Sequence, residues 1–304
     1  MSLPPEGHQP VLLRETLDLL SPQSGEVFID CTLGRGGHAC AIAKLLGPTG
    51  LLIGLDADPR NLEFAAARLK SETNCPTRLF HANFAELPQV LDEVAPPRID
   101  GILADLGVST NQLFDEQYGL SFDGAAKLDM RLDPRIDRTA ADWVNELPER
   151  ELANVLYELA QERHSRRIAR KIGEARTISP ILTTDRLADI VRSAMPHGRG
   201  KGANPIDPAT RTFLALRMAV NSEVVNLAAL LEHGPRSLAP AGRMGVISFQ
   251  STEDRVVKQA FAALREAGLA ELLAKKPVFA SDQEIAANPR SRSARLRAIK
   301  KSGR

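Results

Sequence analysis

The residues with the clearest chemical pattern lie near the start of the chain, where a glycine-rich turn follows a short apolar segment that ends in Asp30. The turn contains Gly34, Gly36 and Gly37. Glycines allow a tight turn and a close approach of the backbone to a ligand, with the N-terminus of the next helix just behind. Asp56 ends the next apolar segment, where a carboxylate can accept hydrogen bonds from both hydroxyls of a ribose. This spacing predicts the nucleoside half of a Rossmann-like site.

The residues of the turn also bear on which nucleoside it binds. A dinucleotide site would have G-x-G-x-x-G directly after the strand, and this turn departs from that pattern. A carboxylate such as Asp30 repels a pyrophosphate but attracts a sulfonium or an ammonium group. No G-x-x-x-x-G-K-[ST] phosphate-binding loop occurs in the chain. These features favour S-adenosylmethionine as the ligand, with an NAD-linked Rossmann oxidoreductase as the alternative.

Further candidates follow the ends of the predicted strands. Phe84 comes just after the third strand, where its ring could cover an adenine or simply join the core. His38 follows the glycines and could offer its backbone N–H to the ligand. Asp105 ends the fourth strand, where its carboxylate could hold the methionine ammonium or accept a hydrogen bond from a substrate amine; the alternative is a turn cap. We take Asp105 and Ser109, in the same segment, as the catalytic candidates.

These residues need a framework, and the first hundred residues alternate between strand and helix patterns. Continuous apolar segments predict buried strands at 26–32, 51–56, 77–82 and 99–106, with helical segments between them. Such alternation indicates right-handed βαβ units and a parallel sheet. Three later segments, at 244–249, 271–275 and 294–300, complete a predicted α/β fold with a seven-stranded, mostly parallel sheet.

The strand pattern stops after residue 110, and helix-start signals replace it. Thr139, Pro148 and Thr184 each come at the start of an amphipathic segment, and a long helix is expected from Pro208 with Asp207 as its cap. We therefore predict a discontinuous core and an inserted all-α domain. The core comprises residues 1–110 and 208–304, and the inserted domain comprises residues 111–207.

Composition narrows the class of protein. Three cysteines without a C-x-x-C pair make a disulfide scaffold or a zinc site unexpected, so no metal is predicted. No apolar run approaches the roughly 18 residues that span a bilayer, and the polar start does not resemble a secretory signal, which favours a cytoplasmic protein without a membrane partner. The net charge is only +1, but residues 163–176 hold six Lys or Arg against one Glu, and no acidic residue follows Glu284. Such patches can bind phosphates, or they can be solvated surfaces.

One predicted helix places polar residues in an apolar context. Arg211, Arg217 and Asn221 interrupt the apolar run that begins at Thr210. An unpaired buried guanidinium is unfavourable, so these groups must be paired or line a polar cavity. Because Thr210, Arg217 and Asn221 share one helical face, we predict that this face looks into a substrate cleft.

Asp129 and Arg131 lie early in the inserted segment and could form the floor of that cleft. The alternative for the polar helix is an internal ion pair with Asp129 or Glu253. Aromatic residues make up only 4% of the chain, so stacking on bases has few candidates. We expect phosphate and shape contacts to dominate any binding of RNA.

Segments along nearly the whole chain are similar to the motifs of one known family. They are HQPVLL at 8–13, DCTLGRGGH at 30–38, LDADP at 55–59, DLGVST at 105–110, LDMRLDP at 128–134, DPATRTFLALRMAVN at 207–221, SFQSTEDRVVK at 248–258 and NPRSRSARLRA at 288–298. Together they resemble the MraW/RsmH family, the 16S rRNA (cytosine(1402)-N(4))-methyltransferases of bacteria and organelles.

The resemblance implies a class I (Rossmann-like) methyltransferase core with an inserted helical domain and S-adenosylmethionine as methyl donor. It implies a cytidine in the decoding centre of the small ribosomal subunit as acceptor, so 16S rRNA would be the partner; the oligomeric state stays open. The implied cofactor contacts are Gly36, Gly37, His38, Asp56, Phe84, Asp105 and Gln112, of which Gln112 rests on the resemblance alone. Gln250, a candidate substrate contact, stands where the family usually has His. A non-catalytic RNA-binding or assembly factor on the same fold is a further alternative.

Overall fold

The contacts within the computed structural model divide the chain into two compact units. Residues 10–122, 124–195 and 207–303 are described. A sheet unit holds the chain up to Gly107 and again from Val224 onward, and a helical unit holds Val108–Glu223. The segment 196–206, which its Gly, Pro and basic residues predict to be a loop, lies outside the described residues.

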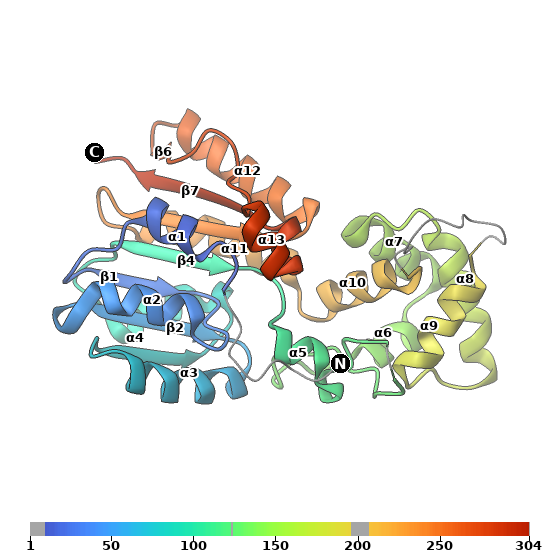
Figure 1. Cartoon of the computed structure of the whole chain (residues 1–304). Coiled ribbons are helices and arrows are strands. Elements are labelled where there is room, and N and C mark those ends of the chain that lie inside the picture. Colours follow the sequence, from blue (N-terminus) through green and yellow to red (C-terminus); the bar gives the residue numbers. More distant parts are fainter. Residues whose placement is uncertain (1–9, 123, 196–206, 304) are drawn as a thin grey trace. The chain divides into compact units, whose positions relative to one another are not determined.

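The sheet unit contains seven strands in the order β3-β2-β1-β4-β5-β7-β6 (Figure 1). They are β1 (Val27–Asp30), β2 (Leu51–Asp56), β3 (Thr77–His81), β4 (Gly101–Asp105), β5 (Arg243–Ser248), β6 (Ala270–Leu272) and β7 (Arg295–Lys301). Strand β7 pairs antiparallel with both β5 and β6, and the remaining pairings are parallel. The predicted seven-stranded, mostly parallel sheet is therefore confirmed. Strand order reverses between β1 and β4, and open sheets of this kind bind ligands outside the carboxyl ends of the strands at such a point.

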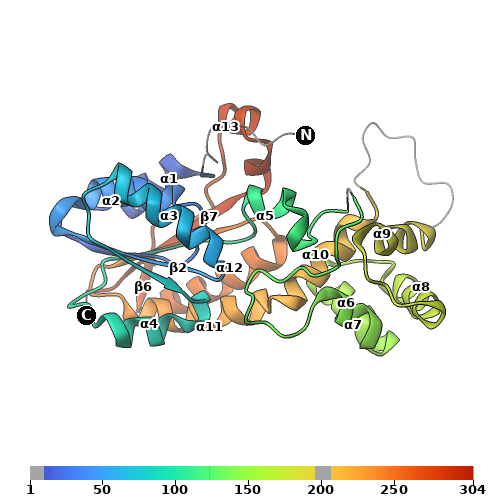
Figure 2. The same cartoon turned by 90° about the horizontal axis from the view of Figure 1, so that it is seen from below.

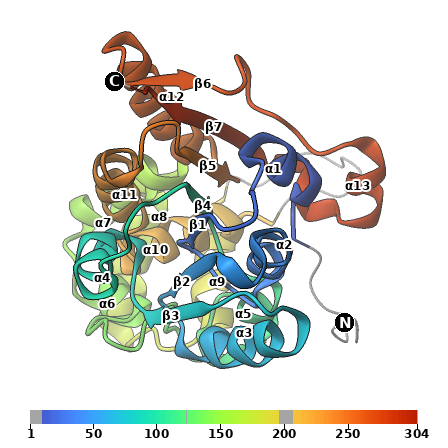
Figure 3. The same cartoon turned by 90° about the vertical axis from the view of Figure 1, so that its left-hand side faces the viewer.

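Two layers of helices cover the sheet, one on each face (Figure 3). One face packs against α1 (Leu13–Leu20), α2 (Gly37–Leu46) and α3 (Pro59–Glu72), and the other against α4 (Leu87–Val94), α11 (Glu223–Ser237) and α12 (Ser251–Glu266). Successive residues of β1 serve opposite cores: Phe28 joins the first, whereas Val27 and Ile29 join the second. The central strands β1, β2 and β4 are largely apolar because both of their faces are buried. A short helix, α13 (Asp282–Ala287), lies in the connection from β6 to β7.

The helical unit is built from α5 (Thr110–Phe114), α6 (Ala140–Glu146), α7 (Glu149–Ala160), α8 (Ser165–Ile178), α9 (Thr184–Ser193) and α10 (Ala209–Val220), which Figure 2 shows from another side. Its core gathers apolar residues from α6 to α10. The sequence assigned α10 to the sheet core, but α10 packs against α6, α7 and α9. The expected long helix also breaks after α10, where Ser222 has a φ of 50°, so the chain returns to the sheet unit at Val224 rather than at residue 208.

Helix starts in this unit test the predicted caps. The hydroxyl of Thr139 accepts a hydrogen bond from the Asp142 N–H at 3.3 Å, and the Asp142 carboxylate accepts from the Thr139 N–H at 2.7 Å. Asp207 Oδ1 accepts a hydrogen bond from the Ala209 N–H at 2.8 Å, but Pro208 rather than Asp207 occupies the cap position of α10. The prediction for Thr184 is wrong: the residue before it occupies the cap position, and the Thr184 hydroxyl donates to a backbone carbonyl instead.

None of the helices in the described ranges combines the length and the apolar composition of a membrane span. The consecutive helices α10 and α11 meet that criterion only as a broken pair.

Candidate functional site

The glycine turn that follows β1 has the backbone conformation that its glycines predict. Gly34 and Gly36 have φ angles of 52° and 76°, in the left-handed region that favours glycine. A Cβ atom on Gly36 would also lie 3.4 Å from Cβ of Ala65 on α3. Helix α2 begins directly after the turn, at Gly37. The turn is held tightly at the carboxyl end of the sheet, because the Gly36 N–H donates to the Leu33 carbonyl at 2.8 Å and Gly36 packs closely against α3.

Asp56, at the end of β2, is tied directly to this turn. Its Oδ2 accepts a hydrogen bond from the Gly34 N–H at 2.6 Å, and its Oδ1 accepts from the Asp58 N–H at 2.8 Å. Burial raises the pKa of Asp56 to about 6, while these hydrogen bonds act in the opposite direction. The structure thus connects the carboxylate at the end of β2 with the glycine turn that follows β1, two features that the sequence placed on separate strands.

Asp30, at the end of β1, is 1% exposed. Its Oδ1 accepts a hydrogen bond from the Thr32 N–H at 3.1 Å. Burial raises the pKa of Asp30 to about 7, and the nearby Asp56 carboxylate adds to this increase. The side chain therefore lies at the strand end predicted for it, in a setting that disfavours its negative charge.

Asp105, at the end of β4, is the least satisfied of the three carboxyl groups. Its Oδ1 is buried and accepts no hydrogen bond from the described residues, and its Oδ2 lies 3.7 Å from Nδ1 of His38. Its backbone N–H donates to the Thr32 hydroxyl at 2.6 Å, which fixes the end of the strand. Burial raises the pKa of Asp105 well above its ordinary value, and the charges of Asp30 and Glu253 raise it further.

The carboxyl groups of Asp30, Asp56 and Asp105 thus lie on neighbouring strand ends; Asp30 and Asp56 are buried, and Asp105 is partly buried, with 20% of its side chain exposed. Among the described residues, no Lys or Arg forms an ion pair with any of them. An unpaired buried carboxylate oxygen is unfavourable in free energy unless a ligand satisfies it. No group of three or more His, Cys, Asp or Glu in the described residues is arranged to hold a metal ion. The site therefore suits a ligand with hydroxyl groups and a positively charged organic group.

His38 connects this site to the N-terminal segment, which the sequence analysis did not foresee. Its Nε2 lies 3.0 Å from the carbonyl oxygen of Val11, so Nε2 carries the proton of that hydrogen bond. The next residue, Leu12, donates its N–H to Oε1 of Glu284 on α13 at 2.8 Å. Residues distant in sequence therefore hold the imidazole against Asp105, and no local pattern could have revealed this.

Phe84 begins a short 3-10 helix just after β3. Its ring packs partly against the core on the α4 face and is not fully buried. The Glu86 carboxylate accepts a hydrogen bond from the Asn83 N–H at 2.7 Å, which holds the start of this helix. Both interpretations of Phe84, as core residue and as a cover for a ligand, are compatible with this position.

Ser109 and Gln112 belong to the helical unit, where they pair with each other. Gln112 Oε1 accepts hydrogen bonds from the Ser109 N–H at 3.0 Å and from its hydroxyl at 2.9 Å. This reciprocal arrangement caps the start of α5. The Ser109 hydroxyl is therefore engaged in a structural contact rather than directed at a reacting group.

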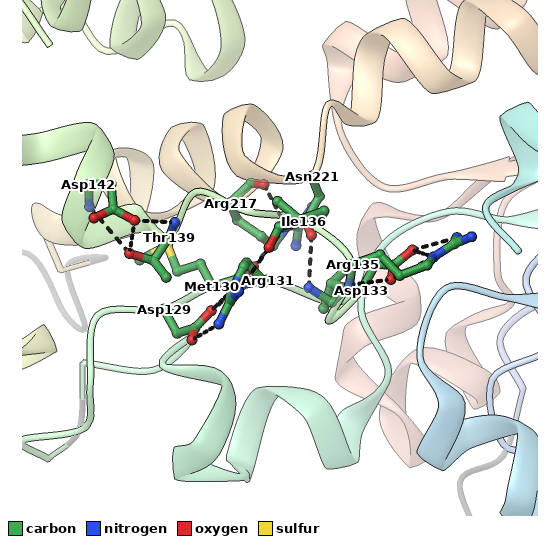
Figure 4. A network of polar contacts seen from close by, with 11 residues as sticks. Asp129, Met130, Arg131, Asp133, Arg135, Ile136, Thr139, Asp142, Arg217 and Asn221 are labelled. Atoms are coloured by element: carbon green, nitrogen blue, oxygen red, sulfur yellow. Dashed lines mark hydrogen bonds and ion pairs between the residues drawn. The ribbon is translucent and has the colours of Figure 1, made fainter. Parts of the chain in front are cut away.

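A polar network in the helical unit contains several predicted substrate contacts (Figure 4). Asp129 and Arg131 form a bidentate ion pair, with distances of 2.7 and 2.9 Å. Asn221 is buried; its Oδ1 accepts from the Leu132 N–H, and its Nδ2 donates to the Met130 carbonyl, both at 2.8 Å. Asn221 therefore holds the LDMR loop, in which Met130 has a left-handed φ of 65°.

Arg217 forms an internal ion pair, which was the alternative left open for this helix, but with a partner that the sequence analysis did not name. Its Nε and Nη2 lie 2.7 and 2.9 Å from the carboxylate of Glu223. The predicted common face of the helix also divides: Thr210 is exposed, whereas Asn221 is buried. Arg211, by contrast, is exposed. The polar groups of Arg217 and Asn221 are therefore used for contacts within the helical unit, with Glu223 and with the LDMR loop.

Gln250 caps the start of α12, just after β5. A single oxygen of Glu253, Oε2, accepts hydrogen bonds from the N–H groups of Phe249 and Gln250, both at 3.0 Å. Glu253 is itself buried, so it fixes the backbone at this strand end. Sequence reasoning considered Glu253 only as a partner for Arg217 and missed this role, although Gln-x-x-Glu has the spacing of a capping box.

Comparison with known proteins gives a consistent result. The profile of the MraW methylase family matches residues 6–302. A protein from Koribacter versatilis is 48% identical over 96% of this chain and 93% of its own length, and one from Syntrophotalea carbinolica is 46% identical over 97% and 98%. Both are named ribosomal RNA small subunit methyltransferase H. A crystal structure of a putative rRNA methylase from Clostridium thermocellum covers 97% of this chain and all of its own, at 10% identity and a TM-score of 0.46.

The extent of these matches identifies the chain. The family profile covers almost all of it, and the relatives exceed 40% identity along nearly their full length. The match to a methylase family contradicts the alternative of an NAD-linked oxidoreductase. The methyl donor is S-adenosylmethionine. The chain belongs to the MraW methylase family.

Proposed function

We propose that the protein methylates the exocyclic N4 amine of a cytidine in small-subunit 16S rRNA, at position 1402 near the decoding centre. The name of its relatives supports a small-subunit rRNA substrate. The buried Oδ1 of Asp105, which accepts no hydrogen bond from the described residues, is the observation in the structure that carries the chemistry. The precise nucleotide rests on the family resemblance of the sequence motifs.

The strand ends offer a matching group for each part of S-adenosylmethionine. Asp56 would accept hydrogen bonds from the ribose hydroxyls, and the turn at Gly34, Gly36 and Gly37 would let the ligand approach the backbone closely. Asp30 would attract the positive charge of the ligand. His38, Phe84 and Gln112 remain proposed contacts. When bound, S-adenosylmethionine supplies a methyl carbon made electrophilic by the sulfonium.

Asp105 would act on the acceptor amine. The lone pair of a cytosine amine is delocalised into the ring, so the amine is a poor nucleophile. An acceptor oxygen on its N–H draws the nitrogen toward tetrahedral geometry and directs the lone pair outward. Because the pKa of Asp105 is raised, its Oδ1 can also accept the proton that the amine releases after methylation. The same carboxyl group thus orients the amine and takes up the proton.

Some of the predicted substrate contacts already form hydrogen bonds or ion pairs within the helical unit. Arg217 and Asn221 are engaged internally, so we assign them to shaping the unit rather than to touching RNA. Asp129 and Arg131 stay partly exposed as an ion pair, and Arg211 is exposed. Gln250 follows the β5 end and could contact the flipped base that such enzymes require.

Labelled S-adenosylmethionine and undermethylated small subunits test the proposal. Label should enter one cytidine of 16S rRNA, and mass spectrometry of nuclease fragments should locate the methyl group on N4. Tight binding of S-adenosylmethionine without transfer to rRNA would refute the substrate assignment. The alternative of a non-catalytic assembly factor predicts that Asp105→Asn leaves rRNA methylation and cellular function unchanged.

A further inference from the structure

The basic stretch 163–176 separates into two groups when its side chains are followed in the structure. In the second group, Arg170 and Lys171 lie 3.7 and 2.7 Å from the carboxylate of Glu174. Arg176 donates a hydrogen bond to a backbone carbonyl of α6 at 2.8 Å. Each positive group in this half of α8 therefore has a partner: Arg170 and Lys171 share the Glu174 carboxylate, and Arg176 joins α8 to α6.

The first group consists of Arg163, Arg166 and Arg167, at the start of α8. All three are exposed, and among the described residues they form no ion pair or hydrogen bond. The acidic residue next to them in sequence, Glu162, is buried, and its Oε1 accepts the His164 N–H at 2.7 Å. The three guanidinium groups thus form a concentration of positive charge without a local counter-charge, which we call the arginine surface.

Helix stability does not explain this arrangement. The N-terminus of a helix carries a partial positive charge, so cations in the first turn are unfavourable and acidic residues are preferred there. Helix α8 has no acidic residue in its first turn, and Arg166 and Arg167 occupy that turn. The opposite face, with Ile168 and Ile172, is fully buried and already supplies the packing. The exposed arginines therefore oppose the helix dipole, and a negatively charged partner would offset this effect.

The composition of the surface indicates the kind of partner. Residues 161–167, Gln-Glu-Arg-His-Ser-Arg-Arg, contain no apolar side chain. Protein interfaces have an apolar core, whereas contacts with nucleic-acid backbones are dominated by Arg and Lys. Arginine also matches the geometry of phosphate with two parallel hydrogen bonds. A phosphate backbone therefore fits this surface better than an acidic protein segment does.

We propose that Arg163, Arg166 and Arg167 bind the phosphate backbone of the RNA substrate. The inference builds on the proposed function, because it assumes an RNA substrate. It assigns the helical unit a role of its own, which is to hold the RNA through sequence-independent contacts. These contacts lower the KM for RNA without taking part in methyl transfer.

The test compares two variants of the full chain that lose equal charge. One carries Arg163→Ala, Arg166→Ala and Arg167→Ala. The matched control carries Arg14→Ala, Arg236→Ala and Arg265→Ala, which remove three exposed arginines of the sheet unit, each near an acidic residue. Affinity for single-stranded RNA and for 16S rRNA is measured by fluorescence anisotropy from 0.05 to 0.3 M salt. Binding of S-adenosylmethionine and thermal melting report on folding.

Three lost phosphate contacts should reduce the slope of log K against log salt by about 2, and raise the Kd for RNA about 100-fold at 0.1 M salt. The KM for RNA should rise while kcat and the Kd for S-adenosylmethionine stay unchanged. The Tm should equal or exceed that of the wild type, because alanine favours the helix and the dipole is no longer opposed. The control variant should keep the affinity and salt slope of the wild type.

Equal slopes and affinities for the two variants would overturn the inference. A loss of binding confined to intact small subunits, with protein-free rRNA bound normally, would also overturn it and would indicate an acidic ribosomal protein as the partner. If the wild type binds RNA through these arginines but methylates no cytidine, the inference stands and the proposed function fails.

Discussion

The strongest quantitative expectation concerns the pH dependence of cofactor binding, which follows from Asp30. Its pKa of about 7 in the free protein means that the carboxyl group is mostly protonated at pH 6. A cationic ligand requires the ionised form, so binding below pH 7 must release a proton. At pH 6 only about a tenth of the protein has Asp30 ionised, so the Kd should be about tenfold higher than at pH 8 from this group alone.

Isothermal titration calorimetry in buffers of different ionisation enthalpy measures the released protons directly. We expect about 0.9 proton from Asp30 per S-adenosylmethionine at pH 6 and about 0.1 at pH 8. Asp56, with a pKa of about 6, and Asp105 act in the same direction and add to the total. The variant Asp30→Asn isolates the contribution of Asp30, because asparagine can still accept the Thr32 N–H but cannot ionise.

In Asp30→Asn the change in Kd between pH 6 and pH 8 should shrink by about tenfold, and the proton release at pH 6 should fall by about 0.9. A wild-type Kd that is constant across this range would refute the assigned role of Asp30. An unchanged proton release in Asp30→Asn would show that a different group senses the ligand charge.

The remaining predictions concern stability and turnover. Because the pKa of Asp30 is raised in the folded state, the folded protein binds more protons than the unfolded chain between about pH 4 and 7, and the ligand-free protein should lose stability as pH rises through that range. Urea titrations should therefore show Asp30→Asn to be more stable than the wild type at pH 8, by on the order of 4 kcal/mol at most. A free energy of unfolding that is independent of pH in both proteins would contradict this. Asp105→Asn should lower the rate of methyl transfer in single-turnover assays by about 10² to 10⁴-fold, while the Kd for S-adenosylmethionine changes far less. A variant that turns over at the wild-type rate would exclude the proposed role of Asp105. Asn221→Ala removes buried hydrogen bonds to the LDMR loop and should lower the free energy of unfolding by about 2–3 kcal/mol. The exposed control Arg211→Ala should change it by less than about 0.5 kcal/mol. Equal effects of the two substitutions would mean that the network does not stabilise the unit. Gly36→Ala should weaken cofactor binding and cost about 1–2 kcal/mol because of its left-handed backbone, and calorimetry showing wild-type affinity would argue against a close approach of the ligand there.

The sequence by itself determined the sheet and the positions of the candidate carboxylates. Apolar strand segments, glycines and helix caps are local signals, since they depend on residues a few positions apart. Asp30, Asp56 and Asp105 could be placed at the ends of β1, β2 and β4 for that reason, and these strands form with nearly the predicted bounds. The connection between Asp56 and the glycine turn could be inferred because parallel strands bring their carboxyl ends to one edge.

Only the tertiary structure decided which polar groups pair with one another. Arg217 forms an ion pair with Glu223, and Asn221 forms hydrogen bonds with the LDMR loop, about ninety residues earlier in the chain. The same holds for His38, which Val11 and Asp105 fix from two sides, and for the unpaired Oδ1 of Asp105. Such choices depend on distances between elements far apart in sequence, and several acidic residues would satisfy an arginine equally well. Local pattern therefore specifies where a charged group stands, whereas packing of the whole chain specifies whether it is neutralised or left for a ligand.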